Sequence, residues 1–186
     1  RQDQSNNYGE IAFGTRNVSN APPADRMRIS KDGYVTKPHT PAFFATHTSG
    51  NNNLIGTLTY NTSGNGYYNN GAHLDVSSGR FHAPVDGIYT FHFHGFFQSG
   101  QADAYYEVIM KRSNSNGGGV LSLCRQYGYR HMDPSNQYGP SISMHCTCYL
   151  TAGQRVEVST GNLAFHGSNG YYLSLIHISE PTRRPI

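Results

Sequence analysis

The chain has 186 residues, a net charge of +3, 36% hydrophobic residues and only 13% charged residues. This length fits one domain with a short appendage, and a disordered chain would carry more charge. The 21 Gly and 14 Tyr residues indicate many short strands joined by tight polar turns. No run of adjacent Lys or Arg exceeds a pair, and no stretch reaches the ~20 apolar residues of a membrane span. We therefore expect neither nucleic-acid binding nor membrane insertion.

Residues 1–40 hold two short alternating runs, at residues 10–15 and 26–35. Asp32-Gly33 is a hairpin-type turn signal within the second run. Neither run can bury a face alone, because an isolated hairpin is only marginally stable in water. We therefore expect them to pair with other copies of the chain or with the residues that follow.

A boundary is expected between Pro38 and Pro41, because proline interrupts regular structure. Residues 1–40 are thus predicted to be a stalk-like β segment with a linker, and residues 41–172 a separate head. The N-terminus has neither an initiator Met nor a signal-peptide pattern. We expect the chain to be a piece of a longer protein.

Strand signals follow at short intervals in the head, broken by Gly and Asn turns. The predicted strands are residues 42–48, 55–62, 71–76, 80–83, 87–97, 104–111, 120–126, 141–150 and 155–160, with a last strand that opens at 170. In the clearest of them, Tyr89, Phe91 and Phe93 share one face, while His92 and His94 lie on the other. About ten such strands without helical periodicity predict an all-β sandwich or jelly roll.

One pattern of residues goes beyond fold class. It consists of Phe81, Gly87, Tyr89, Phe91 and Phe93, with Leu74 seven residues before Phe81 and Asn69 five before Leu74. The spacing resembles the signature of the complement C1q and tumour-necrosis-factor-like family, and the resemblance covers residues 41–172. The chain departs from the signature at Ser63, where its first aromatic residue would fall.

The resemblance implies a ten-stranded jelly roll that associates as a homotrimer and binds partners on its outer surface or loops. The signature residues themselves would be structural, because they fill the core. Some members of the family bind calcium near the trimer axis. No dense Asp/Asn loop of the calcium-binding kind occurs in this chain, so no cofactor is expected.

The two N-terminal runs look like the segments that precede the tips of bacteriophage tail fibres and related virion proteins. A collagen stalk is excluded for this segment, because no Gly-X-Y repeat is present. This resemblance implies the C-terminal end of a viral fibre and a virion location. A secreted protein is the alternative.

Residues 173–186 resemble a translated sequencing adapter, and we expect them to be a non-native tail. The native last strand is then interrupted after Tyr172. Residues 173–178 alternate enough to take its place in a sheet.

The ten histidines and three cysteines raise the question of catalysis or metal binding. Cys146 and Cys148 would share one strand face and His145 the opposite one, which favours buried thiols over a zinc site. No Gly-x-Ser-x-Gly elbow or phosphate loop occurs, and Cys124 has no evident base partner. The chain is therefore predicted to be neither an enzyme nor a metal protein.

Binding is the favoured activity, because residues 113–119 and 127–133 are predicted to be loops rich in Tyr, Ser, Gly and Asn. The candidate ligand residues are Tyr127, Tyr129, Arg130 and His131. The expected partner is a host surface glycan or protein. Two alternatives stay open: a purely structural trimerisation cap of the fibre, and a secreted cellular C1q-like lectin or recognition protein.

Overall fold

The computed structural model describes residues 2–3, 8–16, 22–47, 56–62, 66–98, 104–130, 138–161 and 171–179. Every regular element among these residues is a strand. The chain divides into two compact units, an N-terminal unit (Arg1–Thr40) and a head unit (Pro41–Ile186).

The N-terminal unit contains two small antiparallel sheets. The first pairs β1 (Gln2–Asp3) with β2 (Tyr8–Gly9), and the second has the order β3 (Ile11–Thr15), β4 (Ala24–Ile29), β5 (Val35–Thr36). The turn between β4 and β5 is closed by a hydrogen bond from the Gly33 N–H to the Ser30 carbonyl. Every residue of β3 is exposed, and no residue described in this unit is buried.

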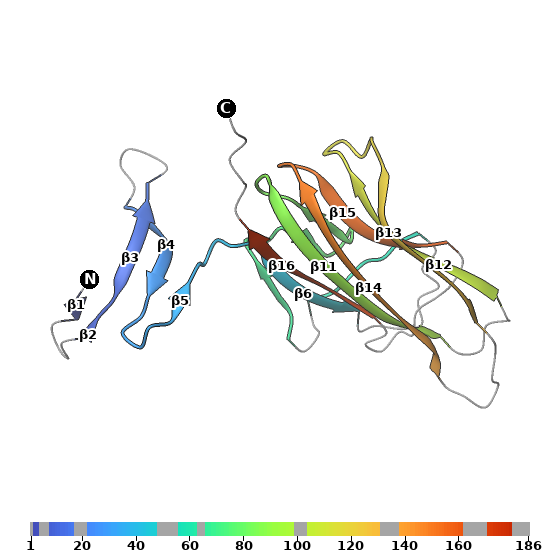
Figure 1. The fold of residues 1–186 in the computed structure, drawn as a ribbon, viewed down its shortest axis with the longest axis horizontal. Helices are drawn as coiled ribbons and strands as arrows, with labels where there is room; N and C mark the ends of the chain where they lie inside the picture. The colour runs from blue at the N-terminus through green and yellow to red at the C-terminus, as the bar shows by residue number, and fades with distance from the viewer. Residues whose placement is uncertain are drawn as a thin grey trace. The chain divides into compact units, whose positions relative to one another are not determined.

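The head unit is a sandwich of two antiparallel sheets (Figure 1). The five-stranded sheet has the order β14 (Tyr138–Leu150), β11 (Gly87–Gln98), β16 (Tyr171–Ser179), β6 (Ala42–His47), β8 (Tyr68–Asn70). The six-stranded sheet has the order β13 (Leu121–Arg130), β12 (Ala104–Ser113), β15 (Arg155–Thr160), β10 (Arg80–His82), β9 (Leu74–Asp75), with β7 (Gly56–Thr57) also paired to β15. The predicted all-β jelly-roll sandwich is confirmed.

Strict alternation along the strands builds the core between the sheets. In β11 the side chains of Tyr89, Phe91 and Phe93 are fully buried, and in β15 those of Val156 and Val158 are. Because neighbouring side chains of a strand point to opposite faces, the intervening residues of both strands face outward.

The predicted strand 55–62 is wrong over most of its length. Only Gly56 and Thr57 pair with β15, although Leu58 and Tyr60 are buried as an alternating pattern requires. The Leu58 N–H donates to Val158 in one sheet, whereas the Asn61 N–H donates to Thr46 in the other. This segment crosses between the sheets and so cannot follow one ladder.

The turn between β9 and β10 ends at Gly79, which has a φ of +69°. A Cβ atom at this position would lie 1.7 Å from the Leu58 carbonyl oxygen. Glycine is therefore required at this position for two reasons. The backbone is left-handed, and the segment that crosses between the sheets approaches it closely.

The predicted loop at residues 127–133 is corrected at its beginning. Tyr127, Tyr129 and Arg130 belong to β13, which pairs with β12 through the partners Tyr127–Glu107 and Tyr129–Tyr105. Gly128 suggested a turn, but its backbone is covered by the ring of Tyr106, which lies where a Cβ would be. The fourth candidate, His131, lies outside the described residues.

The last strand, β16, runs through the predicted junction at Tyr172. It lies between β11 and β6, and the side chains of Leu173 and Leu175 are buried in the core. The expectation that residues 173–178 take the place of a strand matches this arrangement. Their origin as a non-native tail stays a prediction.

Candidate recognition surface

The family-signature residues lie in or beside the core. Phe81 contacts the rings of Tyr89 and Phe91, with centroids 5.4 and 5.5 Å away, and Phe93 and Gly87 are also buried. Asn69 has a different task, since its side chain donates to the Leu74 carbonyl (2.8 Å) and accepts from the Leu74 N–H (3.2 Å). This clamp joins β8 of one sheet to β9 of the other.

Three exposed tyrosines, Tyr105, Tyr127 and Tyr129, lie on the outward face of the six-stranded sheet. We call the surface that they form the tyrosine face. Their exposed fractions are 74%, 62% and 54%. Tyr105 and Tyr129 are cross-strand partners whose rings meet edge to face at 5.0 Å. Large aromatic side chains with this much exposed area are typical of binding surfaces.

Arg125 holds the side chain of Tyr127 in place on the tyrosine face. Its guanidinium lies over the Tyr127 ring, donates to the Tyr127 hydroxyl (2.7 Å) and forms an ion pair with Glu107 (3.2 Å). The hydrogen bond to Tyr127 raises the pKa of Arg125. The Tyr127 ring is thus held in place before any ligand arrives, which lowers the entropy cost of binding.

The outward face of the five-stranded sheet has a different character, and we call it the uncharged face. Among its described side chains there is no Asp, Glu, Lys or Arg. Its members include the exposed or half-buried residues Phe44, Tyr68, Ile88, Thr90, His92, His94, Phe96, His145, Thr147, Tyr149 and Tyr172. Aromatic side chains without charge are the composition of an interface core.

Three histidines lie close together on the uncharged face. His92 and His145 are cross-strand partners, and the His94 ring stacks on Tyr172 at 5.3 Å. Burial lowers the pKa of His92, and His94 and His145 lower it further. Within the described ranges, no group of three or more His, Cys, Asp or Glu side chains is placed to hold a metal ion.

Comparison with known proteins agrees with this architecture. The family model of the C1q domain matches residues 42–172. The chain belongs to the C1q domain family. Complement C1q tumor necrosis factor-related protein 3 of Homo sapiens is 32% identical to it over 128 residues, as is the protein of that name from Mus musculus. Each match covers 69% of this chain and 45% of the relative, so the chain spans less than half the length of these curated relatives.

The cysteines of the C1q domain are free thiols on the core side of their strands. Cys146 is buried and Cys148 is half-buried, and the register places His145 on the opposite face, as predicted. Burial raises the pKa of both thiols, that of Cys148 to about 12. A thiol with so high a pKa is protonated near neutral pH and is a poor nucleophile or metal ligand.

Two carboxylates of the C1q domain hold turns together. Asp75 accepts hydrogen bonds from the Ser77 and Ser78 hydroxyls (2.7 and 2.6 Å), and Asp86 accepts from the Ala152 N–H (2.8 Å). The described part of the chain contains no apolar helix of membrane-spanning length.

Proposed function

We propose that this C1q domain is a non-enzymatic recognition head that acts as a homotrimer and binds a host surface glycan or protein through the tyrosine face. The observation that carries the proposal is the exposure of Tyr105, Tyr127 and Tyr129, which lie on two paired strands with a fixed register. Tyrosine supplies rigid contact area at low entropy cost and a hydroxyl for hydrogen bonds. Flat rings on a sheet suit stacking against sugar rings.

Trimer formation is supported by the uncharged face and by the family, whose domains commonly form trimers. An interface buries aromatic side chains well but charged ones poorly. The six-stranded sheet, in contrast, turns Arg125 and Glu107 outward next to the tyrosine face, and Arg80 outward at the other end of the sheet. We therefore assign the uncharged face to the partner chains and the tyrosine face to the ligand.

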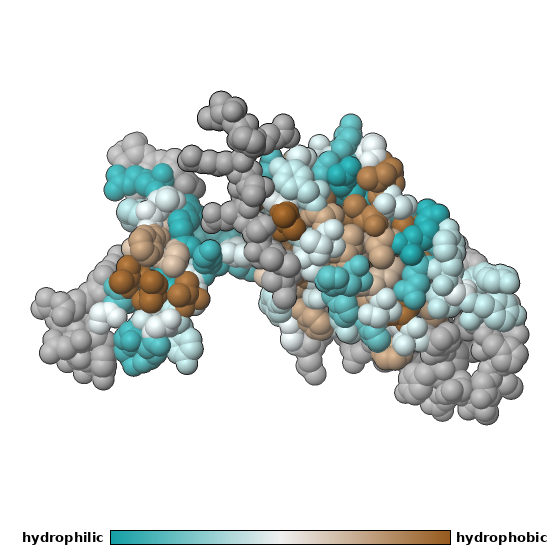
Figure 2. Space-filling model, in the orientation of Figure 1, coloured by the Kyte–Doolittle hydropathy of each residue, from teal (hydrophilic) through white to brown (hydrophobic). Residues whose placement is uncertain are grey.

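The N-terminal unit supports the same assembly. Ile11, Phe13 and Val35 have exposed fractions of 56%, 54% and 54%, and Figure 2 shows hydrophobic surface over the sheet that contains β3 and β4. A small sheet with exposed apolar side chains gains stability by pairing with other copies of the chain. This is the arrangement expected of a fibre stalk.

For the biological setting we propose a viral fibre, on the resemblance of the two N-terminal runs to tail-fibre segments. A secreted recognition protein fits the curated C1q-related relatives equally well. Recovery of the upstream reading frame separates the two. A signal peptide followed by Gly-X-Y repeats would contradict the viral setting but not the recognition head.

The proposal is tested by the binding of the full chain to intact host cells and to a glycan array. We expect saturable binding, and a loss of at least about tenfold in the double variant Tyr127→Ala/Tyr129→Ala, because stacking on aromatic rings contributes strongly to such contacts. Tyr34→Ala is the matched control, since Tyr34 is 71% exposed but belongs to the N-terminal unit. Absence of binding to every surface tested would instead support a purely structural trimerisation cap.

A further inference from the structure

A second feature of the six-stranded sheet is a pocket of about 260 Å³ at the opposite end of the outward face from Tyr105 and Tyr129. Its lining includes Arg80, Lys111, Arg155, Glu157, Ser113 and Asn116. Sites for drug-sized ligands have volumes of ~300–1,000 Å³. The pocket is therefore slightly smaller than a site for a drug-sized ligand.

Strand register brings the charges of the pocket together from three strands. Glu157 of β15 is the cross-strand partner of Arg80 on β10 and of Lys111 on β12, and Arg155 is the partner of Ser113. The three strands are far apart in the sequence. The lining holds three cations and one carboxylate.

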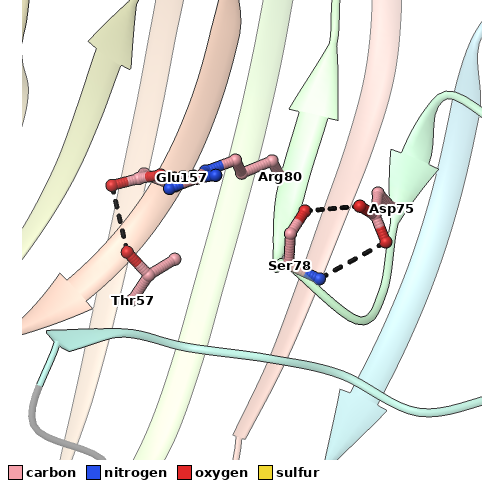
Figure 3. Close-up of polar contacts among 5 residues, drawn as sticks. All are labelled: Thr57, Asp75, Ser78, Arg80 and Glu157. Carbon is pink, nitrogen blue, oxygen red and sulfur yellow. Dashed lines mark hydrogen bonds and ion pairs between the residues drawn. The ribbon is translucent and has the colours of Figure 1, made fainter. Parts of the chain in front are cut away.

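The single carboxylate is already satisfied within the protein. Figure 3 shows Glu157 between Thr57 and Arg80, accepting hydrogen bonds from the Thr57 hydroxyl (3.1 Å) and from Arg80 Nε (2.8 Å). Arg80 and Glu157 form an ion pair and so neutralise each other. Lys111 and Arg155 remain as excess positive charge.

Neither Lys111 nor Arg155 forms an ion pair with a carboxylate among the described residues. The Nε of Arg155 is also buried without a hydrogen-bond partner in the described structure. A buried donor left unpaired costs free energy, more so when it belongs to a charged group. Lys111 and Arg155 thus bring positive charge to the pocket that no carboxylate of the described residues neutralises through an ion pair.

The wall formed by residues 113–120 is ordered by its own turn. The Gly117 N–H donates to the Asn114 carbonyl (2.9 Å), and the Asn114 N–H donates to the Gly118 carbonyl (2.8 Å). The Gly118 N–H donates to the side-chain oxygen of Asn116 (3.0 Å). The pocket is therefore shaped before a ligand enters, and binding requires little further ordering.

We propose that this pocket binds a single oxyanion group, a sulfate, phosphate or carboxylate, through Lys111 and Arg155, with Ser113 as a neutral donor. Arginine and lysine are the residues that recognise such groups in proteins. The Tyr105–Lys111 segment of β12 spans about 20 Å at ~3.3 Å per residue. One acidic saccharide chain can thus reach from the pocket toward the tyrosine face. The pocket requires neither the trimer nor the viral setting.

His82 provides a local reporter of the bound group, since it neighbours Arg155 across the sheet. Burial lowers its pKa first, Arg155 and Arg80 lower it further, and Asp75 opposes them. His73 is a second titrating neighbour whose own pKa is lowered partly by His82. An anion in the pocket offsets the positive field of the two arginines, so the pKa of His82 must rise when the anion binds.

The test is a titration of the full chain with sodium sulfate at constant ionic strength, followed by the NMR signals of His82. We expect saturable binding and a raised pKa of His82. Lys111→Gln and Arg155→Gln should each weaken binding about tenfold or more, because each removes a charge-assisted contact. Glu157→Gln should tighten it, because that change removes a negative charge. Lys37→Gln, an equal change of charge in the N-terminal unit, should leave it unchanged.

Further titrations compare the affinities of sulfate and phosphate with those of glucosamine 6-sulfate, glucuronic acid and N-acetylneuraminic acid. They show whether the bound oxyanion is free or carried by a sugar. Tighter binding of a sugar-borne group assigns the pocket to an acidic saccharide, and equal affinities assign it to a free oxyanion. The proposal is overturned if no probe binds saturably, or if Lys111→Gln and Arg155→Gln bind like the wild type while their thermal unfolding is unchanged. Sulfate binding without any host-surface binding would leave the pocket intact and refute the recognition head alone.

Discussion

The side chain of Phe81 connects the two sheets of the C1q domain. It projects from β10 and meets Phe43 of β6 at 5.7 Å, in addition to Tyr89 and Phe91 of β11. It is fully buried. Removal of a ring in such a position costs about 3–5 kcal/mol, so the spacing of the family signature records a requirement of folding and not of binding.

The single residue Asp75 stabilises the turn between β9 and β10. Hydrogen bonds from the Ser78 and Ser77 hydroxyls lower the pKa of Asp75 from 3.8 to about 2. A carboxyl with a lowered pKa stabilises the fold while it is ionised, and this contribution is lost as the pH falls from about 4 to about 2.

We therefore expect Asp75→Asn to lower the unfolding temperature at neutral pH, and the gap to the wild type to shrink as the pH falls toward 2. Thermal unfolding of both proteins across this pH range measures the gap. A gap that stays constant with pH would show that the carboxylate charge is not what stabilises the turn.

Individual residues were predictable where alternation alone decides their environment. Tyr89, Phe91 and Phe93 are inward and His92 and His94 outward, as the sequence pattern indicates. Gly128 misled the prediction, because glycine is enriched in turns but here makes room for a ring from the next strand. The distinction depends on Tyr106, which is distant in sequence and becomes a neighbour only through the fold.

Strand β16 is an internal strand of the five-stranded sheet. It pairs with β11 on one side and β6 on the other, and it contributes Tyr171, Leu173 and Leu175 to the core. Without it, β11 and β6 would each lose one of their two hydrogen-bonding partners, and the core would lose three buried side chains.

A chain that ends at Tyr172 is expected to lose cooperative unfolding, as measured by circular dichroism. Within the full chain, Leu173→Ala should destabilise the domain by about 2–5 kcal/mol. Ser174→Ala, one residue along on the outward face, should change stability by about 0.5 kcal/mol or less. Equal effects of the two substitutions would mean that β16 does not occupy this place in the sheet.

Strand order was beyond prediction even where strand positions were nearly right. The bounds of β15 match the predicted residues 155–160, yet the pattern does not indicate that its neighbours are β12 and β10. Such pairings connect residues far apart in sequence. They are fixed by closure of the whole sandwich and not by local preference.

At the scale of the whole molecule, the two outward faces of the sandwich differ in charge. The side chains described on the uncharged face lack Asp, Glu, Lys and Arg, whereas Arg80, Lys111, Arg125 and Glu157 all lie on the other face. A charge introduced into an interface core must lose its hydration without gaining a partner. The trimer is therefore expected to be sensitive to charge on one face only.

Sedimentation of the full chain at micromolar concentration should give a trimer. Thr90→Glu, which places a carboxylate beside Thr147 on the uncharged face, should shift the chain to monomers. Leu121→Glu is the control, because Leu121 is 51% exposed at the start of β13 on the other sheet. A wild-type chain that sediments as a stable monomer would refute the trimer.

The candidate sites illustrate what remained hidden in the sequence at this scale. Two of the three residues of the tyrosine face, Tyr127 and Tyr129, were predicted from the sequence. Tyr105 was not, because it joins them only through the pairing of β12 with β13. The oxyanion pocket was not visible at all. Its charges come from three strands and a loop, and no local motif connects them.

In strand β12, residues that pack in the core alternate with residues that are available for ligand binding. Tyr106, Val108 and Met110 face the core, while Tyr105, Glu107 and Lys111 face outward. The outward residues Tyr105, Glu107 and Lys111 can thus change to alter ligand preference while the fold remains the same. A library randomised only at the exposed or half-buried outward positions of β12 and β13 would explore new specificities without the loss of folded clones that core mutations cause.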